Sequence, residues 1–430
     1  MSDLPAKSAR SDGILGDPMT IAVVALGITQ ITAWGTSYYC LGVLAGSIGS
    51  EFGWTRGFVF LGFTVSVLTM AFISTLVGRL IDRHGGRLMM SIGSIIVAFG
   101  LFLLSLVQAE WAYLAIWVLI GVGMRLCLYD AAFAAIVQVV PTRGRMAISY
   151  LTLFGAFASS VFWVVGHYLD EALGWRQTLV VFAVLNIVLC LPLHWFGLAR
   201  REAVGATNAG AAPRPGSMSV PPPLEGRARK IGIVLFALIM SLNGFVFGIV
   251  SVQLVPLLEG AGLAAATAVW LASMKGVAQF AGRVVEISLG RNLSPIVVAR
   301  VSMVAMVAAF ALLYASGGLF ALLFAFTFLM GAAQGVLSIV RGTVPLALFG
   351  AQGYGAVTGL IATPILFVSA CAPTIFAWIV DRWGWSPANL VVLAMAAVSF
   401  LCMEAMAIWH RRHVARLAGN EPAIGRAASG

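Results

Sequence analysis

Charged side chains inside long apolar segments are the residues of this sequence most able to do chemistry. One such set interrupts the apolar segment 267–288, where the charged residues Lys275, Arg283 and Glu286 are joined by the neutral amide of Gln279. On a helix that turns about 100° per residue these positions fall within about 80° of arc, so they form one polar stripe. The stripe is expected to face protein or water, with Lys275 and Gln279 binding a small anion. An internal ion pair between Arg283 and Glu286 is the alternative.

A second polar set, Arg125, Tyr129 and Asp130, lies in the apolar segment 111–139. Arg125 and Tyr129 share a helix face, and a guanidinium can hold a carboxylate through two parallel hydrogen bonds. In a continuous helix Asp130 lies about 140° round from Arg125, so we expect a direct pair to be strained and Asp130 to meet another helix. A desolvated carboxyl can take up a proton, which makes Asp130 the predicted proton-coupling residue. A structural charge network is the alternative for both charges.

Aromatic and amide side chains recur at helical spacing in two further segments. Gln30, Trp34 and Tyr38 are four residues apart, and Asn243 lies in the apolar segment 231–257. Such groups suit a cavity with an apolar wall and a few polar anchors. Trp34, Tyr38 and Asn243 therefore join the predicted binding residues, with helix packing as the alternative for each.

Twelve long apolar segments position these residues. Of the 430 residues, 60% are hydrophobic and 10% are charged, whereas soluble domains have about 25% charged residues. A helix needs roughly 20 apolar residues to cross a bilayer. The sequence therefore predicts an all-α polytopic membrane protein with twelve transmembrane helices. We expect them near residues 20–44, 58–77, 88–107, 111–139, 146–169, 177–198, 231–257, 267–288, 296–315, 319–340, 356–380 and 388–409.

Basic residues are distributed unequally between the two faces of this arrangement. Twenty of the 26 lysines and arginines, Arg341 among them, fall in the tails and loops of one face, against Arg56, Arg176 and Arg382 on the other. This asymmetry predicts that both termini are cytoplasmic, in a plasma membrane that we expect to be a bacterial inner membrane. The net charge of +10 then orients the protein and faces anionic lipid, and does not indicate binding to nucleic acid.

A proline-rich stretch divides the twelve segments into six and six. Gly174-Trp175 precedes the sixth segment and Gly384-Trp385 the twelfth, a shift of 210 residues. Weak internal symmetry of this kind is typical of secondary transporters. We therefore predict two pseudo-symmetric six-helix bundles, a linker and two cytoplasmic tails: 1–18 (tail), 19–199 (bundle), 200–230 (linker), 231–412 (bundle) and 413–430 (tail).

The loop after the second segment contains a motif. From Gly78 to Arg87 it reads GRLIDRHGGR, which resembles the loop signature of the major facilitator superfamily, glycine–x–leucine–x–aspartate–arginine–x–glycine followed by a basic residue. The resemblance implies a conformational latch made of Gly78, Asp82, Arg83, Gly85 and Arg87. Asp82 would face a helix end or a basic partner across the cytoplasmic interface, and the two arginines would pair with acidic groups or lipid. The second half lacks the aspartate–arginine pair.

The eighth segment is also loosely similar to the monocarboxylate and oxalate–formate branches of that superfamily. There a basic residue on this helix commonly neutralises a substrate carboxylate. The resemblance implies a secondary transporter for a small organic anion, a carboxylate, with protons as a candidate coupling ion. Monocarboxylate carriers often have an acidic residue four positions before the arginine, where this sequence has Gln279.

Two other functions are alternatives to anion transport. Within transport the alternative is an efflux antiporter. Drug–proton antiporters of the superfamily often have a glycine–proline signature in the fifth helix. The corresponding stretch 155–160 reads GAFASS and lacks the proline, which disfavours this alternative. A membrane enzyme or sensor is disfavoured, because no HExxH, GxSxG or P-loop pattern occurs. The five cysteines have no metal-ligand spacing. We predict no metal, no cofactor and no catalytic residue.

Overall fold

The computed structural model describes residues 17–202 and 222–420, and within them every regular element is helical. The first half contains α1 (Pro18–Ala33), η2 (Trp34–Tyr38), α2 (Leu41–Phe52), α3 (Arg56–His84), α4 (Gly86–Ser105), α5 (Glu110–Cys127), α6 (Tyr129–Val139), α7 (Gly144–Gly155), α8 (Ala158–Leu173), α9 (Trp175–Leu185), η3 (Asn186–Cys190) and α10 (Leu191–Gly197). The second half contains α11 (Gly226–Gly260), α12 (Ala265–Leu289), η5 (Gly290–Asn292), α13 (Pro295–Tyr314), α14 (Phe320–Phe349), α15 (Tyr354–Trp383) and α16 (Trp385–Asn420).

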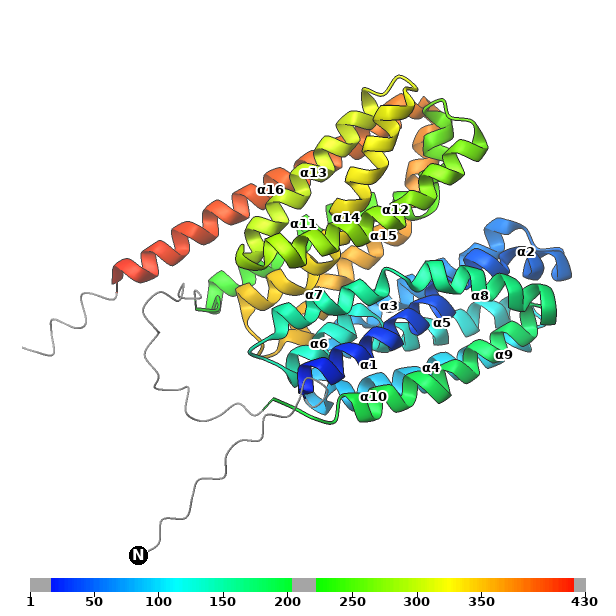
Figure 1. Ribbon diagram of the computed structural model, residues 1–430, viewed down its shortest axis with the longest axis horizontal. Helices are drawn as coiled ribbons and strands as arrows, with labels where there is room; N and C mark the ends of the chain where they lie inside the picture. Colours follow the sequence, from blue (N-terminus) through cyan, green and yellow to red (C-terminus); the bar gives the residue numbers. More distant parts are fainter. Residues whose placement is uncertain (1–16, 203–221, 421–430) are drawn as a thin grey trace, which may run out of the picture.

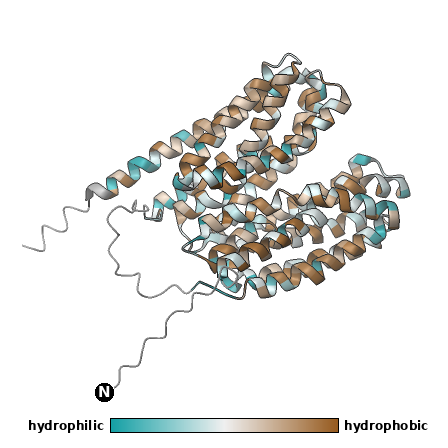
Figure 2. Ribbon diagram, viewed as in Figure 1, coloured by the Kyte–Doolittle hydropathy of each residue, from teal (hydrophilic) through white to brown (hydrophobic). Residues whose placement is uncertain are grey.

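These elements make up twelve helical spans, as predicted. Eleven of the described spans are long and apolar enough to cross a membrane. The twelfth is α12, which has 25 residues and whose polar stripe lowers its hydropathy. Figure 2 shows apolar residues along the helices of both bundles. Large apolar side chains also point outward, and Phe72 and Trp111 are each 76% exposed. An outer surface of this kind suits lipid and would aggregate in water.

The spans form two related bundles, which Figure 1 shows converging at one side and diverging toward the other. We call the side where α1 begins and α16 ends the terminal side. The helices α8 and α15 end alike, at Gly174 and Gly384, both with a φ of 82°. This left-handed backbone is easily reached only by glycine, and each glycine is followed by a tryptophan that begins the next helix. The repeated turn confirms the predicted pseudo-symmetry.

Several spans of the first bundle are interrupted where the sequence predicts continuous helices. The first and sixth spans contain the π-helical turns η2 and η3, and the fourth is broken at Leu128, whose backbone is extended. The fifth span is interrupted between α7 and α8. Hydropathy cannot reveal such breaks, because they do not change the apolar character of the segment.

Helix ends also differ from the predicted boundaries. The helix α11 begins at Gly226, inside the predicted linker, and α16 runs to Asn420, past residue 412. Lysine and arginine are good helix formers, so both helices continue through them. A boundary predicted from hydropathy falls where these basic residues interrupt the apolar segment. Most of the predicted tails and linker, at 1–16, 203–221 and 421–430, lies outside the described residues. The division into domains therefore stays a prediction.

Candidate functional site

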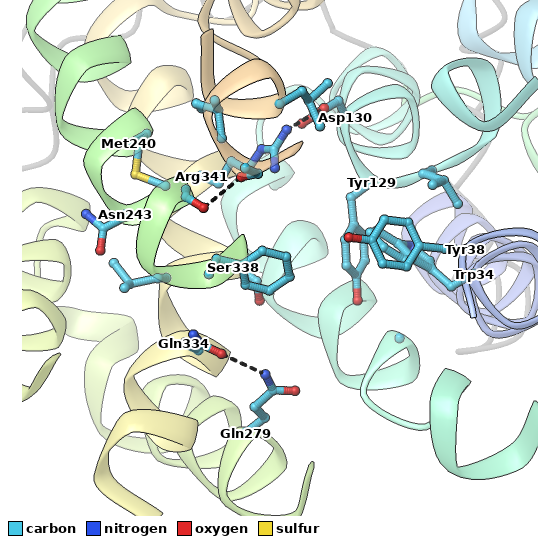
Figure 3. Close-up of a pocket in the computed structure, with 18 of the residues that line it drawn as sticks. Trp34, Tyr38, Tyr129, Asp130, Met240, Asn243, Gln279, Gln334, Ser338 and Arg341 are labelled. Carbon is cyan, nitrogen blue, oxygen red and sulfur yellow. Dashed lines mark hydrogen bonds and ion pairs between the residues drawn. The ribbon is translucent and has the colours of Figure 1, made fainter. Parts of the chain in front are cut away.

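A cavity of about 170 Å³ lies between the two bundles. Its wall is formed mainly by η2, the α5–α6 junction and the α7–α8 junction on one side, and by α11, α12, α14 and α15 on the other. In Figure 3 aromatic rings of the first bundle face polar side chains of the second. The predicted site residues on this wall are Trp34, Tyr38, Tyr129, Asp130, Asn243 and Gln279.

Asp130 joins two arginines at the cavity (Figure 3 shows the contact with Arg341). Its Oδ2 atom lies 3.2 Å from Nη1 of Arg125 and 2.7 Å from Nη2 of Arg341, on α14. The side chains of Arg125 and Asp130 are 2% and 8% exposed, and Arg125 lies behind the wall. The expected contact of Asp130 with another helix is confirmed. The expectation that a direct Arg125–Asp130 pair is strained is wrong.

The break at Leu128 explains that error. Its extended backbone (φ −80°, ψ −173°) separates α5 from α6. The angle between the side chains of Arg125 and Asp130 is therefore not the roughly 140° of a continuous helix. The carbonyl of Cys127 at the break accepts a 2.7 Å hydrogen bond from Nε2 of Gln30. The indole of Trp34 donates to Oε1 of Gln30 at 3.1 Å. An irregular membrane backbone needs such partners, and this one is connected to the cavity wall through Trp34.

The second bundle forms what we call the polar wall of the cavity. This wall contains a guanidinium whose hydrogen-bonding capacity is only partly used. Nε of Arg283 donates to the carbonyl of Gly335 and to Oγ of Ser338, both at 3.3 Å. Arg283 is 5% exposed, and its Nη1 has no hydrogen-bond partner among the described residues. Nearby, Nε2 of Gln279 lies 3.5 Å from Oε1 of Gln334. This wall therefore offers donors that a bound acceptor would satisfy.

Aromatic rings form the opposite wall. The ring centroid of Trp34 lies 4.7 Å from that of Tyr38 and 5.2 Å from that of Tyr129. Tyr129 also stacks on Phe133, with centroids 5.2 Å apart. These separations are those of favourable tilted and offset aromatic pairs. The predicted aromatic and amide positions thus converge on the cavity, although they come from separate spans.

Lys275 lies away from its expected place, whereas Asn243 lies on the wall with its amide already in use. Lys275 is not on the cavity wall; its Nζ lies 5.9 Å from the ring centroid of Phe247, one turn of α12 beyond Gln279. Helical periodicity placed it on the correct face but not at the correct depth. Asn243 lines the cavity, but its Nδ2 donates to Oγ of Ser399 at 2.5 Å.

Sequence analysis missed three residues of the polar wall: Gln334, Ser338 and Arg341. We expected the tenth span to end at residue 340 and assigned Arg341 to a loop, which is wrong, because α14 continues to Phe349 with Pro345 inside it. The signal was present, since the stretch 342–349, GTVPLALF, remains apolar after the arginine.

Asp82 connects the two bundles at the terminal side. Its Oδ1 and Oδ2 accept hydrogen bonds from the backbone amides of Gly355 and Ala356, at 2.9 and 2.7 Å. These amides lie in the first turn of α15, where an α-helix provides no acceptor and a negative charge is favourable. Of the two partners left open by the sequence, a helix end and a basic residue, the helix end is found.

The other residues of the motif act locally. A side chain at Gly78 would collide with the backbone of Gly355, so glycine permits close approach of α3 to α15. Gly85 ends α3 with a φ of 87°. Arg87 stacks over Trp195 at 4.1 Å and Arg83 is exposed. The expected pairing of these arginines with acidic groups is not found among the described residues.

A further interbundle contact joins α7 to the end of α12. Nη2 of Arg145 donates to the carbonyl of Gly290 at 3.1 Å and lies 3.9 Å from Oε1 of Glu286. The Arg283–Glu286 pair, the alternative that the sequence left open, is not formed in the described structure, where Glu286 meets the opposite bundle. Together with Asp82, this contact holds the bundles together at the terminal side of the cavity.

A cavity between two pseudo-symmetric bundles of membrane-spanning helices is the architecture of a secondary transporter. The comparison with known families agrees, because the family model described as Major Facilitator Superfamily matches residues 26–316. The chain belongs to the Major Facilitator Superfamily and is a multi-pass membrane protein of this transporter family.

Individual relatives are distant. The agnestins efflux protein AgnL12 of Paecilomyces divaricatus is 24% identical over 187 residues, which span 42% of this chain and 41% of that protein. The human organic anion transporter MFSD10 (TETRAN) superposes with a TM-score of 0.70 and 14% identity over 90% of this chain and 100% of that chain. For FucP in its outward conformation the TM-score is 0.66 and the identity 17%, over 91% and 99% of the two chains. These structural likenesses show the fold alone.

Proposed function

We propose that this protein is a secondary active transporter that moves a small organic anion, a carboxylate, by alternating access. The observation that supports this most is the charge of the cavity wall. Arg283 and Arg341 line it, and Asp130 is the only acidic residue among the described residues that do so. A buried guanidinium without a full set of partners is costly. An anion that accepts hydrogen bonds from Arg283 would remove that cost.

Asp130 is the proposed site of proton coupling. In the described state it pairs with both Arg125 and Arg341. Protonation would remove the negative charge that holds these guanidiniums and would leave Arg341 free to bind a substrate carboxylate. Proton uptake and anion binding would then favour each other, as a symporter requires. Lys275, one turn from the wall, would attract the anion before it enters.

Alternating access would use the contacts at the terminal side, which we propose is cytoplasmic because the basic residues gather there. The amide contacts of Asp82 close this side, and breaking them would let the bundles rock and open the cavity to the cytoplasm. In this proposal Gly78 and Gly85 shape the latch, while Arg83 and Arg87 face lipid headgroups or neighbouring aromatic side chains.

Export of an anionic metabolite is a second candidate function. It is favoured by the similarity to a protein named for efflux, although that match spans less than half of the relative. The same cavity charge would serve either direction. Uptake into inside-out vesicles under an imposed proton gradient would favour export, and uptake into right-side-out vesicles would favour import.

The test is counterflow in proteoliposomes with a panel of labelled carboxylates, each paired with its uncharged amide. Carboxylates should be transported and amides should not. A charge-assisted hydrogen bond contributes about 1.5–3 kcal/mol, so Arg283→Ala should weaken carboxylate binding about 10- to 150-fold. Arg382→Ala, at an exposed position outside the cavity, is the matched control. Equal transport of the acids and amides would refute the anion assignment.

A further inference from the structure

We infer that the anion is a small aromatic carboxylate, a single six-membered ring bearing one carboxylate group. This inference rests on the proposed function and narrows it to a substrate class. The binding mode places the ring against the first bundle and the carboxylate against the second.

The size of the cavity supports one ring. Its volume is about 170 Å³, and an engineered protein cavity of about 150 Å³ binds benzene. A single ring with a carboxylate therefore matches the space. A carboxylate with a chain of two or three carbons would leave part of it unfilled, with a loss of contacts along the aromatic wall.

The wall of the first bundle has the shape and chemistry to hold a ring. Trp34, Tyr38 and Tyr129 come from η2 and α6 and cluster around the indole. All three are only partly buried and line the cavity, as Figure 3 shows. A ligand ring placed there would add a further edge-to-face or offset contact to rings already spaced for such contacts.

The wall of the second bundle supplies the opposite chemistry. Nη1 of Arg283 and Nε2 of Gln334 are buried and have no hydrogen-bond partner in the described structure. A carboxylate has two acceptor oxygens in one plane, which a guanidinium can bind in parallel. A neutral sugar could also stack on the aromatic wall, but it would leave the buried guanidinium of Arg283 without an anionic partner.

The two walls together select an amphipathic planar anion, because each wall alone would also accept a ligand that lacks either the ring or the charge. A short aliphatic acid would satisfy the arginines without the rings. A neutral aromatic molecule would contact the rings without the arginines. The aromatic acid bridges both bundles, so its binding also joins the two parts that must move relative to each other.

The experiment is binding to the purified full-length protein, measured by calorimetry and thermal shift. The ligands are benzoate, phenylacetate, butyrate and benzamide. We expect the better aromatic acid to bind at least about tenfold more tightly than butyrate and than benzamide. Tyr38→Leu should remove most of the advantage over butyrate, and Tyr38→Phe should retain it. Tyr168→Leu, at a position 66% exposed, should change neither affinity.

The outcomes separate this inference from the proposed function. Butyrate binding as tightly as the better aromatic acid would overturn the aromatic assignment while leaving an anion transporter in place. Benzamide binding as tightly as the better aromatic acid, or no binding by any carboxylate, would overturn the proposed anion function as well. The ligand ranking of the wild-type protein decides the matter even where Tyr38→Leu does not fold.

Discussion

Replacing Asp82 by alanine is expected to open the terminal side of the protein. The carboxylate accepts two hydrogen bonds, of 2.9 and 2.7 Å, from first-turn amides of α15. Loss of an N-terminal capping side chain costs about 1 kcal/mol, and loss of a charge at a helix N-terminus about 0.3–1 kcal/mol. The sum of about 1.3–2 kcal/mol shifts the equilibrium between closed and open states about 9- to 30-fold.

The assay measures access to the interface between the bundles. Ile148 is fully buried and lies against Gly342 of the second bundle, so a cysteine at position 148 can react only when the terminal side opens. In a background without the five native cysteines, Asp82→Ala should accelerate maleimide labelling of Ile148→Cys up to about 30-fold. Asp381→Ala, an exposed aspartate near the end of α15, is the matched control.

Hydrogen exchange at Gly355 and Ala356 distinguishes a latch from a local cap. Exchange of these amides should rise in Asp82→Ala in either case, since their acceptor is removed. If exchange rises while labelling at position 148 stays at the wild-type rate, Asp82 caps a helix and does not control the opening. Asp82 does not line the cavity, so transport should fall more than substrate binding.

Three further predictions concern coupling, the helix break and pH. Asp130→Asn should abolish gradient-driven accumulation in proteoliposomes yet retain substrate exchange; accumulation that survives would exclude this residue as the proton site. Gln30→Leu should destabilise the fold by about 1–3 kcal/mol in thermal unfolding, whereas Gln352→Leu at an exposed position should have no effect; equal stability of the two variants would contradict the role of the amide at the break. The hydrogen bond and charge of Arg143 lower the pKa of Asp17 below 3.8. Because the folded pKa is the lower one, the stabilisation is complete above the unfolded value and is lost only as pH falls through the folded value. Asp17→Asn should therefore lower Tm equally at about pH 6 and about pH 8, and unequal shifts would refute this assignment.

The sequence alone was sufficient to predict the architecture, because lipid imposes a simple rule. Every spanning segment must satisfy its own backbone hydrogen bonds and present apolar side chains, so composition and segment length identify the helices. The charges inside these segments were informative for the same reason. Asp130 and Gln279 had to face the interior, and both lie on the cavity wall. The repeated glycine–tryptophan pairs indicated the pseudo-symmetry that the φ angles of Gly174 and Gly384 confirm.

Only the tertiary structure decided which polar groups meet. The Arg125–Asp130 contact depends on the break at Leu128, and periodicity assumes a continuous helix. Arg341 reaches Asp130 from a helix that lies more than two hundred residues away in the chain, and no local pattern records such a contact. The depth of Lys275 along α12 likewise depends on how the bundles dock. The solvent around a helix determines which segments span the membrane and which helix face turns inward. Packing between helices determines which side chains meet and how deep each one lies.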